Sequence, residues 1–267
     1  MNPAILLSKY GSCVSLSLDG GNILSWQVYN EKTKNSDDIF YIGSTERRGG
    51  MPVLFPFANP LDDGVLKISH KKIGQHGFAR DSNWQLVNMS ESSAKISLTN
   101  LNISPEMQIA YPFEFQISII VSLKSPNSLE YTIEVKNTDK KDLPIAPGLH
   151  PYFALNHLSK PQLKIMNSDA SLDLHPIDWE NDMDGNFYNW TDKSMVCVFP
   201  DKIITIAETD TKHFENIVVW SQTPQKSDTH FVCIEPFTRK TNAINDQPIL
   251  VKPSSAWSTT LIFSVVN

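Results

Sequence analysis

Hydrophobic and polar residues alternate with a period of two along much of the chain, which is typical of half-buried β-strands. The clearest example has apolar residues at every second position from Phe115 to Leu123, and again from Leu129 to Val135. Turn-forming residues separate the two runs at positions 126–128. Two alternating runs around a short turn predict a β-hairpin.

Similar alternation or short apolar runs predict further strands elsewhere. Gly20 and Gly21 mark a turn after the predicted strand at 14–18. The 17 prolines are scattered along the chain, which suits loops and strand ends better than helix interiors. The stretch 156–195 is the most irregular and is expected to be a long excursion over one sheet edge, with candidate short strands at 163–165 and 171–174. The other predicted strands are 14–18, 94–98, 203–207, 217–220, 231–234 and 261–266.

Composition supports one large folded unit. The chain has 267 residues, of which 40% are hydrophobic and 10% aromatic, so it can bury a sizeable core. It has no internal repeat, low-complexity tract or linker-like change in composition. We therefore predict a single all-β domain spanning 1–267 and built as a packed sandwich.

Charge and sequence signals exclude several other classes of protein. The formal net charge of −6 and the absence of a basic run argue against a nucleic-acid partner. No stretch approaches the roughly 18 apolar residues that cross a bilayer, and the first residues do not form a signal peptide. The three cysteines, Cys13, Cys197 and Cys233, are far apart, which favours reduced thiols in a cytoplasmic protein.

Two glycine-containing clusters carry candidate binding residues. In the first, Arg47 and Arg48 precede Gly49 and Gly50 in a segment with two prolines; its alternative is a surface loop with solvated arginines. The second, at 74–81, places His76 and Arg80 among glycines that let a ligand approach the backbone; its alternative is a turn with a chance histidine.

Two further clusters carry candidate acid–base residues. His150 lies in a rigid Gly-Leu-His-Pro-Tyr-Phe setting, where the alternative is a core histidine at a strand end. Glu235 ends an apolar strand, and strand alternation puts Phe231, Cys233 and Glu235 on one face. A desolvated carboxylate has a raised pKa and serves as a base near neutrality, whereas the alternative is a strand-end glutamate that faces water.

Metal and hydrolase motifs are missing from the sequence. None of the seven histidines falls in an H-x-H or H-E-x-x-H pattern, which disfavours a cupin-like metal enzyme. There is also no G-x-S-x-G motif of a serine hydrolase and no phosphate-binding glycine loop. We therefore expect no metal and no cofactor.

The order of the four clusters resembles the aldose 1-epimerase (galactose mutarotase-like) family, near its branch of hexose-6-phosphate epimerases. The shared strings are R-G-G-x-P, G-Q-H-G-F-A-R, G-L-H-P-Y-F and E-P-F, and the resemblance spans nearly the whole chain. It implies a large antiparallel β-sandwich, often called a supersandwich, with a sugar site on its concave face.

The resemblance also implies a role for each matching residue. Glu235 matches the general base, and His150, with an ordinary pKa near 6.5, matches the general acid. His76 matches a histidine that contacts the sugar near its ring-opening region. Arg48 and Arg80 match arginines that hold the sugar or its phosphate. The implied reaction interconverts the α and β anomers by opening and closing the sugar ring, with the acid and the base on opposite sides of the C1–O5 unit.

Three questions stay open at the level of sequence. The substrate is a free hexose or a hexose 6-phosphate, and a non-catalytic carbohydrate-binding protein on the same fold is the alternative to an enzyme. The family's aspartate that holds sugar hydroxyls has no clear counterpart, since Asp178, Asp182 and Asp184 are all candidates.

Overall fold

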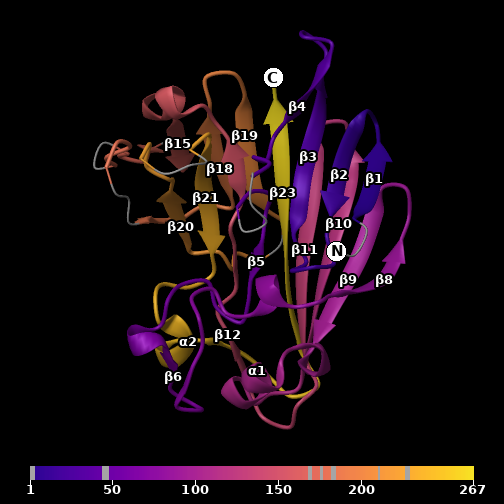
Figure 1. Ribbon diagram of the computed structural model, residues 1–267, viewed down its shortest axis with the longest axis vertical. Coiled ribbons are helices and arrows are strands. Elements are labelled where there is room, and N and C mark those ends of the chain that lie inside the picture. Colours follow the sequence, from indigo (N-terminus) through magenta and orange to yellow (C-terminus); the bar gives the residue numbers. More distant parts are fainter. Residues whose placement is uncertain are drawn as a thin grey trace.

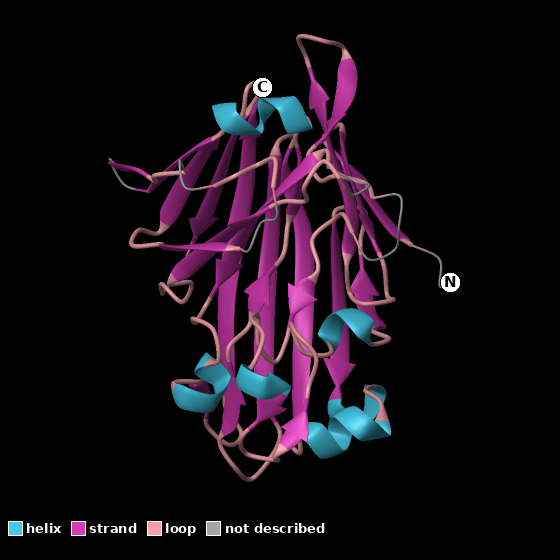
Figure 2. Cartoon of the chain, turned by 60° about the vertical axis from the view of Figure 1, so that its left-hand side comes forward, coloured by secondary structure: helices cyan, strands magenta, loops and turns pink. Residues whose placement is uncertain are grey.

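The structure, a computed structural model, describes residues 4–43, 48–167, 170–174, 177–181, 185–209, 211–225 and 229–267. Within these residues the chain folds into layered sheets whose paired strands run antiparallel, as the alternating pattern predicted (Figure 1). The helices are short segments that lie toward the ends of the long strands (Figure 2).

The largest sheet has nine strands in the order β16-β15-β18-β19-β23-β11-β10-β9-β8. Its long central strands, β23, β11 and β10, run side by side in Figure 1. The predicted hairpin is confirmed as β10 and β11, with Ile117 opposite Val135 and Ile119 opposite Ile133. The strands of this sheet are β8 (Gln85–Met89), β9 (Ser93–Thr99), β10 (Phe115–Ser125), β11 (Ser128–Asn137), β15 (Lys164–Asn167), β16 (Ala170–Ser171), β18 (Ser194–Val198), β19 (Ile203–Glu208) and β23 (Ala256–Val266).

A six-stranded sheet follows the order β17-β20-β21-β13-β5, with β14 also paired to β21. A four-stranded sheet follows the order β1-β2-β3-β4, and two-stranded sheets are formed by β12 with β22 and by β6 with β7. These strands are β1 (Ile5–Lys9), β2 (Ser12–Leu16), β3 (Ile23–Asn30), β4 (Asn35–Asp38), β5 (Val53–Leu54), β6 (Val65–Leu66), β7 (Lys71–Lys72), β12 (Leu143–Ile145), β13 (Gly148–Leu149), β14 (Tyr152–Ala154), β17 (Asn186–Asn189), β20 (Asn216–Trp220), β21 (Phe231–Phe237) and β22 (Ile249–Val251).

Short helices complete the connections between strands. None of the helices in the described part of the chain is long and apolar enough to cross a membrane. They are the α-helices α1 (Pro105–Ala110) and α2 (Ala243–Asp246), and the 3-10 helices η1 (Asp62–Gly64), η2 (Ala79–Asp81), η3 (Asn100–Asn102) and η4 (His157–Gln162).

The hydrophobic core lies between the nine-stranded sheet and the smaller sheets that pack against it. Phe55, just after β5, contacts Phe115 of β10 with ring centroids 5.2 Å apart. On the other side of the molecule, Phe40 lies 5.8 Å from Trp26 of β3 and 6.3 Å from Phe263 of β23. Aromatic side chains from the facing sheets therefore interdigitate, as in a β-sandwich.

The irregular stretch 156–195 builds the edges of two sheets rather than passing over one. Its strands β15 and β16 end the nine-stranded sheet, whereas β17 ends the six-stranded sheet. The expected strand at 163–165 corresponds to β15. The expected strand at 171–174 is wrong beyond Ser171, because the chain leaves the sheet edge after β16 has paired two residues with β15.

Candidate active site

A cleft of about 580 Å³ lies on the outer face of the six-stranded sheet. Strand alternation gives this sheet two different faces, because successive side chains of a strand point to opposite sides. In β20, Ile217 and Val219 are fully buried in the main core, whereas Val218 and Trp220 line the cleft. Glu235 lines the cleft from the neighbouring strand β21.

All five residues to which the resemblance assigns a role line this one cleft. They are brought together from four separate segments of the chain, which no single motif could indicate. The residues are Arg48, His76, Arg80, His150 and Glu235.

The imidazole of His150 and the carboxyl of Glu235 are in direct contact. His150 Nε2 lies 3.4 Å from Glu235 Oε1, and the two residues are only 6% and 3% exposed. The other ring nitrogen of His150, Nδ1, has no hydrogen-bond partner in the described part of the chain. The structure places the candidate acid and base side by side, and their expected arrangement on opposite sides of the C1–O5 unit of a bound sugar stays a prediction.

Aromatic packing holds the His150 ring in place. Tyr152, two residues further along, stacks on the imidazole with ring centroids 4.7 Å apart and planes inclined by 15°. Trp220 meets the same ring edge-on at 5.9 Å. With aromatic rings on two sides, the imidazole is positioned by packing as well as by its contact with Glu235.

Burial changes the protonation of this pair. It raises the pKa of the Glu235 carboxyl well above its usual range, against a smaller opposing effect of Arg80. It lowers the pKa of His150 well below its usual range, and His76 and Arg80 lower it further. The expectation that His150 keeps an ordinary pKa near 6.5 is therefore wrong. Adding a second proton and removing the last one are both unfavourable, so the pair holds one proton over a wide pH range.

His76 faces His150 across the cleft, with ring centroids 5.4 Å apart. Burial, followed by the charge of Arg80, lowers the pKa of His76 to about 4, so the ring is neutral near pH 7. Its Nδ1–H donates a hydrogen bond to the backbone oxygen of Ala58. That bond leaves Nε2 as a hydrogen-bond acceptor, suited to a sugar hydroxyl.

The backbone beside His76 explains the glycine that follows it. His76 and Gly77 both have φ of 71°, in the left-handed region that favours glycine. A Cβ at Gly77 would lie 2.2 Å from the backbone oxygen of Phe55, which no side chain can tolerate. The close approach fixes the segment that carries His76 against the end of β5.

Arg48 and Arg80 bring positive charge to the cleft. Arg80, in η2, keeps its side chain 34% exposed, lies 4.0 Å from a carboxylate oxygen of Asp81 and donates to the backbone oxygen of Gln75 at 3.5 Å. Both contacts are long, so the Arg80 guanidinium can turn toward a ligand. Arg47 and Glu46, which were considered with these arginines, lie outside the described residues.

Several lining residues were missed by sequence reasoning. Asn59 is 7% exposed, and its side-chain Nδ2 has no hydrogen-bond partner among the described residues. Gln75, Phe187 and Trp220 also line the cleft. Gln75 lies within a recognised string, but the other three carry no local signal and come together only through the sheet. Two of the three aspartate candidates, Asp182 and Asp184, lie outside the described residues.

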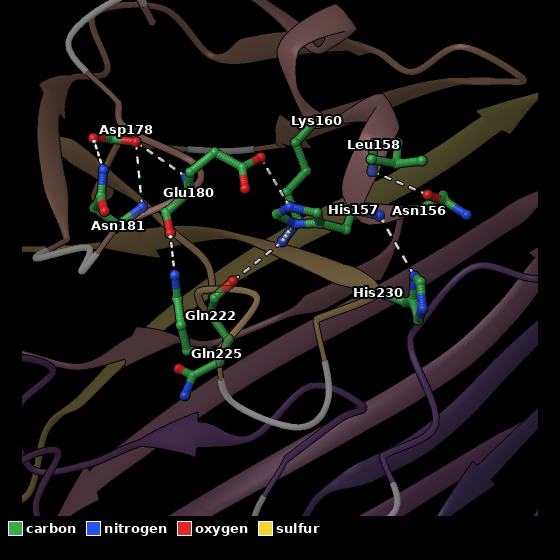
Figure 3. A network of polar contacts seen from close by, with 10 residues as sticks. All are labelled: Asn156, His157, Leu158, Lys160, Asp178, Glu180, Asn181, Gln222, Gln225 and His230. Carbon is green, nitrogen blue, oxygen red and sulfur yellow. Dashed lines mark hydrogen bonds and ion pairs between the residues drawn. The ribbon is translucent and has the colours of Figure 1, made fainter.

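Asp178, the remaining aspartate candidate, belongs to a network of polar contacts that joins the segment 178–181 to the helix η4 (Figure 3). Its carboxylate accepts backbone hydrogen bonds from Glu180 and Asn181 within a tight turn. The Glu180 carboxylate in turn lies 3.1 Å from His157 Nε2. Asp178 therefore shapes this turn, and it is not among the described residues that line the cleft.

The centre of that network is a fully buried lysine. Lys160, in η4, is 0% exposed and donates hydrogen bonds to the backbone oxygen of Gln222 at 3.3 Å and to His157 Nδ1 at 3.2 Å (Figure 3). Burial lowers the pKa of Lys160 to about 8. The network ties the excursion to the loop that follows β20.

The floor of the cleft also gathers three groups of metal-ligating type. Ligand atoms of His150, Cys233 and Glu235 all lie within 4.8 Å of one another, and all three residues are buried. The predicted common face of Cys233 and Glu235 on β21 is thereby confirmed. Two members of the set are the candidate acid and base, so an ion held here would compete with proton transfer.

A sequence model of the aldose 1-epimerase family matches residues 3–263. The chain belongs to the aldose 1-epimerase family. Among its relatives, a Cenchrus ciliaris protein named "Putative glucose-6-phosphate 1-epimerase" is 22% identical, over 100% of this chain and 85% of that protein.

Solved structures support the fold assignment. A protein from Synechocystis sp. PCC 6803 superimposes with a TM-score of 0.79 at 21% identity, covering 99% of this chain and 96% of the other. A galactose mutarotase related enzyme from Lactobacillus acidophilus gives a TM-score of 0.76 at 22% identity, covering 99% and 97%. The large antiparallel β-sandwich expected from the resemblance is thereby confirmed.

Proposed function

We propose that this family member is an active isomerase that interconverts the α and β anomers of a hexose or hexose 6-phosphate. The observation that supports the proposal most directly is the contact between His150 Nε2 and Glu235 Oε1 at the floor of the cleft. Ring opening of a hemiacetal needs one base and one acid, and this pair offers both. His76 adds a neutral acceptor for a sugar hydroxyl.

In the proposed reaction, the Glu235 carboxylate removes the proton of the anomeric hydroxyl while the His150 imidazolium protonates the ring oxygen. The C1–O5 bond breaks, and the open-chain aldehyde forms. Rotation about C1–C2 turns the other face of the aldehyde to the ring hydroxyl, and the reverse proton transfers close the ring. The pair begins and ends each turnover with one proton, so it needs none from solvent.

Burial of the pair determines where its proton lies before ring opening. The ion pair that begins ring opening becomes a carboxylic acid and a neutral imidazole once both protons have moved. Burial favours that neutral pair, as the raised pKa of Glu235 and the lowered pKa of His150 indicate. The single proton of the pair therefore lies on Glu235 in the free protein, and its transfer to His150 Nε2 across the 3.4 Å contact precedes ring opening.

The two arginines favour a phosphorylated substrate within this proposal. A guanidinium binds phosphate with paired, charge-assisted hydrogen bonds, and Arg48 and Arg80 both line the cleft. The relative from Cenchrus ciliaris carries a name that refers to glucose 6-phosphate. We also propose a cytoplasmic location, where sugar phosphates occur and where the three free cysteines stay reduced.

The test compares kcat/KM for glucose and glucose 6-phosphate in the wild type and in Arg80→Ala, with anomer exchange followed by NMR. Loss of one charge-assisted contact, worth about 1.5–3 kcal/mol, should lower the value for glucose 6-phosphate roughly 10- to 100-fold. The value for glucose should change much less. Arg239→Ala is the matched control, because Arg239 pairs with Glu215 outside the cleft.

Equal use of both sugars by the wild type, or an unchanged ratio in Arg80→Ala, would remove Arg80 from phosphate binding and favour a free hexose. Sugar binding without any acceleration of anomer exchange would instead support the non-catalytic carbohydrate-binding alternative.

A further inference from the structure

Strand β21 carries two metal-ligating side chains on the face that turns toward the cleft. Cys233 and Glu235 are two residues apart, so their side chains point to the same side of the sheet. Ile234, between them, belongs to the main hydrophobic core on the opposite side. Tyr152 and Trp220, which line the cleft, are the register partners of Cys233 on the two neighbouring strands. The thiol therefore lies just beneath the floor of the cleft.

His150 completes a set of three ligands with zinc-like spacing. The ligand atoms of His150, Cys233 and Glu235 all lie within 4.8 Å of one another. A tetrahedral Zn²⁺ with bonds of about 2.0–2.3 Å holds its nitrogen, oxygen and sulfur ligands about 3.4–3.6 Å apart. His150 Nε2 and Glu235 Oε1 already have this separation, at 3.4 Å. The other separations exceed it by at most about 1.2 Å, so small side-chain movements complete the site.

The donor set favours a transition-metal ion. Thiolate and imidazole ligands suit Zn²⁺, whereas Mg²⁺ and Ca²⁺ prefer oxygen ligands. His150 and Glu235 line the cleft, which gives an ion its way in and leaves a fourth coordination position for water. The expectation of no metal rested on short motifs. This set combines β21 with the residue between β13 and β14, so no short motif could reveal it.

Charge balance allows a divalent ion at this buried point. Binding takes one proton from the Cys233 thiol and the single proton that His150 and Glu235 share, so two positive charges replace two others. The resulting group of one dication, one thiolate and one carboxylate carries no net charge, which limits the cost of burial. Arg80 and Lys160 place positive charge near Glu235 and Cys233 and oppose a bare cation, so both anionic ligands are needed.

We propose that His150, Cys233 and Glu235 form an inhibitory site for a divalent transition-metal ion such as Zn²⁺. A bound ion occupies the lone pair of the imidazole and an oxygen of the carboxylate, so neither group can move a proton and anomer exchange stops. Binding of the ion stands on the three ligands alone, whereas the inhibition rests on the proposed function. Cys233 takes no part in the proposed reaction and serves only the metal.

Cobalt(II) reports binding at Cys233, because a thiolate bound to cobalt gives a charge-transfer absorption band in the near ultraviolet. The wild type should develop this band, and Zn²⁺ should remove it by displacing the cobalt. Cys233→Ser should lack the band. Cys197→Ser, the matched control with a buried thiol in the nine-stranded sheet, should keep it. The thiol of Cys13 is present in both variants, so it cannot account for the difference.

Zinc inhibition of anomer exchange tests the consequence of binding. Saturating Zn²⁺ should lower the wild-type exchange rate by at least about 10²-fold, the value of one positioned proton transfer, and EDTA should restore it. Cys233→Ser should exchange anomers at the wild-type rate without metal. It should need at least about 10-fold more zinc for half inhibition, since even residues that only orient metal ligands are worth about 10- to 100-fold in affinity.

The cobalt band separates this proposal from the proposed function. A band that depends on Cys233 supports the metal site even in a protein that epimerises no sugar. A wild type without the band, or a band that persists in folded Cys233→Ser and Cys233→Ala proteins, would overturn the site and leave the proposed function standing. A zinc-loaded wild type that exchanges anomers at the full rate would overturn the inhibition. A thermal melt verifies that each variant is folded.

Discussion

Replacing Glu235 with glutamine separates proton transfer from sugar binding. Glu235 is only 3% exposed, and its Oε1 lies 3.4 Å from His150 Nε2. Glutamine has nearly the same shape and keeps an oxygen that can accept a hydrogen bond from His150. It cannot take up the proton of the anomeric hydroxyl. We therefore expect sugar affinity to persist while turnover falls.

The size of the loss follows from the step removed. A positioned proton transfer is typically worth about 10²- to 10⁴-fold in rate. That range corresponds to about 3–5 kcal/mol in the activation barrier, at about 1.4 kcal/mol for each factor of ten. We expect kcat of Glu235→Gln to fall by this factor, whereas the dissociation constant for the sugar should change less than about threefold.

Exchange NMR between the α and β anomers measures kcat, and fluorescence titration measures binding. The exchange rate in buffer alone is subtracted, because sugars also mutarotate without enzyme. Glu134→Gln provides the matched control, since Glu134 pairs with Lys95 on a different sheet. A Glu235→Gln protein with nearly full kcat would refute the assignment of Glu235 as the base.

Three further predictions follow from the same structure. The pH profile of kcat/KM should be bell-shaped. Its acidic limb reports protonation of His150, whose pKa is lowered by burial, and its alkaline limb reports loss of the proton from Glu235, whose pKa is raised by burial. An alkaline limb that persists in Glu235→Gln would contradict the assignment of that limb to Glu235. Lys160 has a pKa of about 8 in the folded protein, against an ordinary lysine pKa of 10.5 in the unfolded chain, so the unfolded chain binds more protons between these values. Urea unfolding should therefore show the wild type gaining stability relative to Lys160→Met as pH rises through this window. A stability difference independent of pH would exclude a titrating Lys160. Gly77→Ala should lower the free energy of unfolding by more than about 1 kcal/mol and should reduce kcat, because the added Cβ would collide with the Phe55 backbone and displace His76. A Gly77→Ala variant with wild-type melting and turnover would show that the close approach of Gly77 to Phe55 is not required.

Local patterns were sufficient to predict much of the sheet framework. The β10–β11 hairpin was predictable because both strands alternate and a short turn joins them, so the information is contained in one segment. The shared face of Cys233 and Glu235 followed in the same way from a single strand. The strand expected at 171–174 failed because a sheet edge, not the local sequence, decides where β16 ends.

The site could be predicted only where motifs carried it. His76, His150 and Glu235 stand in recognisable strings, but their contact depends on how distant strands pair. Neither the lowered pKa of His150 nor the neutral state of His76 could be read from sequence, because both arise from burial. Asn59 has ordinary neighbours in the sequence, and only the cleft reveals that its side-chain Nδ2 has no hydrogen-bond partner among the described residues.

The most direct test of the account is anomer exchange catalysed by the wild-type protein. Freshly dissolved α-glucose and α-glucose 6-phosphate are followed by exchange NMR in chelator-treated buffer, with His150→Asn and Glu235→Gln measured alongside. The account predicts an exchange rate that rises in proportion to wild-type protein concentration for at least one sugar, and returns close to the buffer rate in both variants. A wild-type rate equal to that of buffer for both sugars, or full activity in either variant, would contradict catalysis by the His150–Glu235 pair.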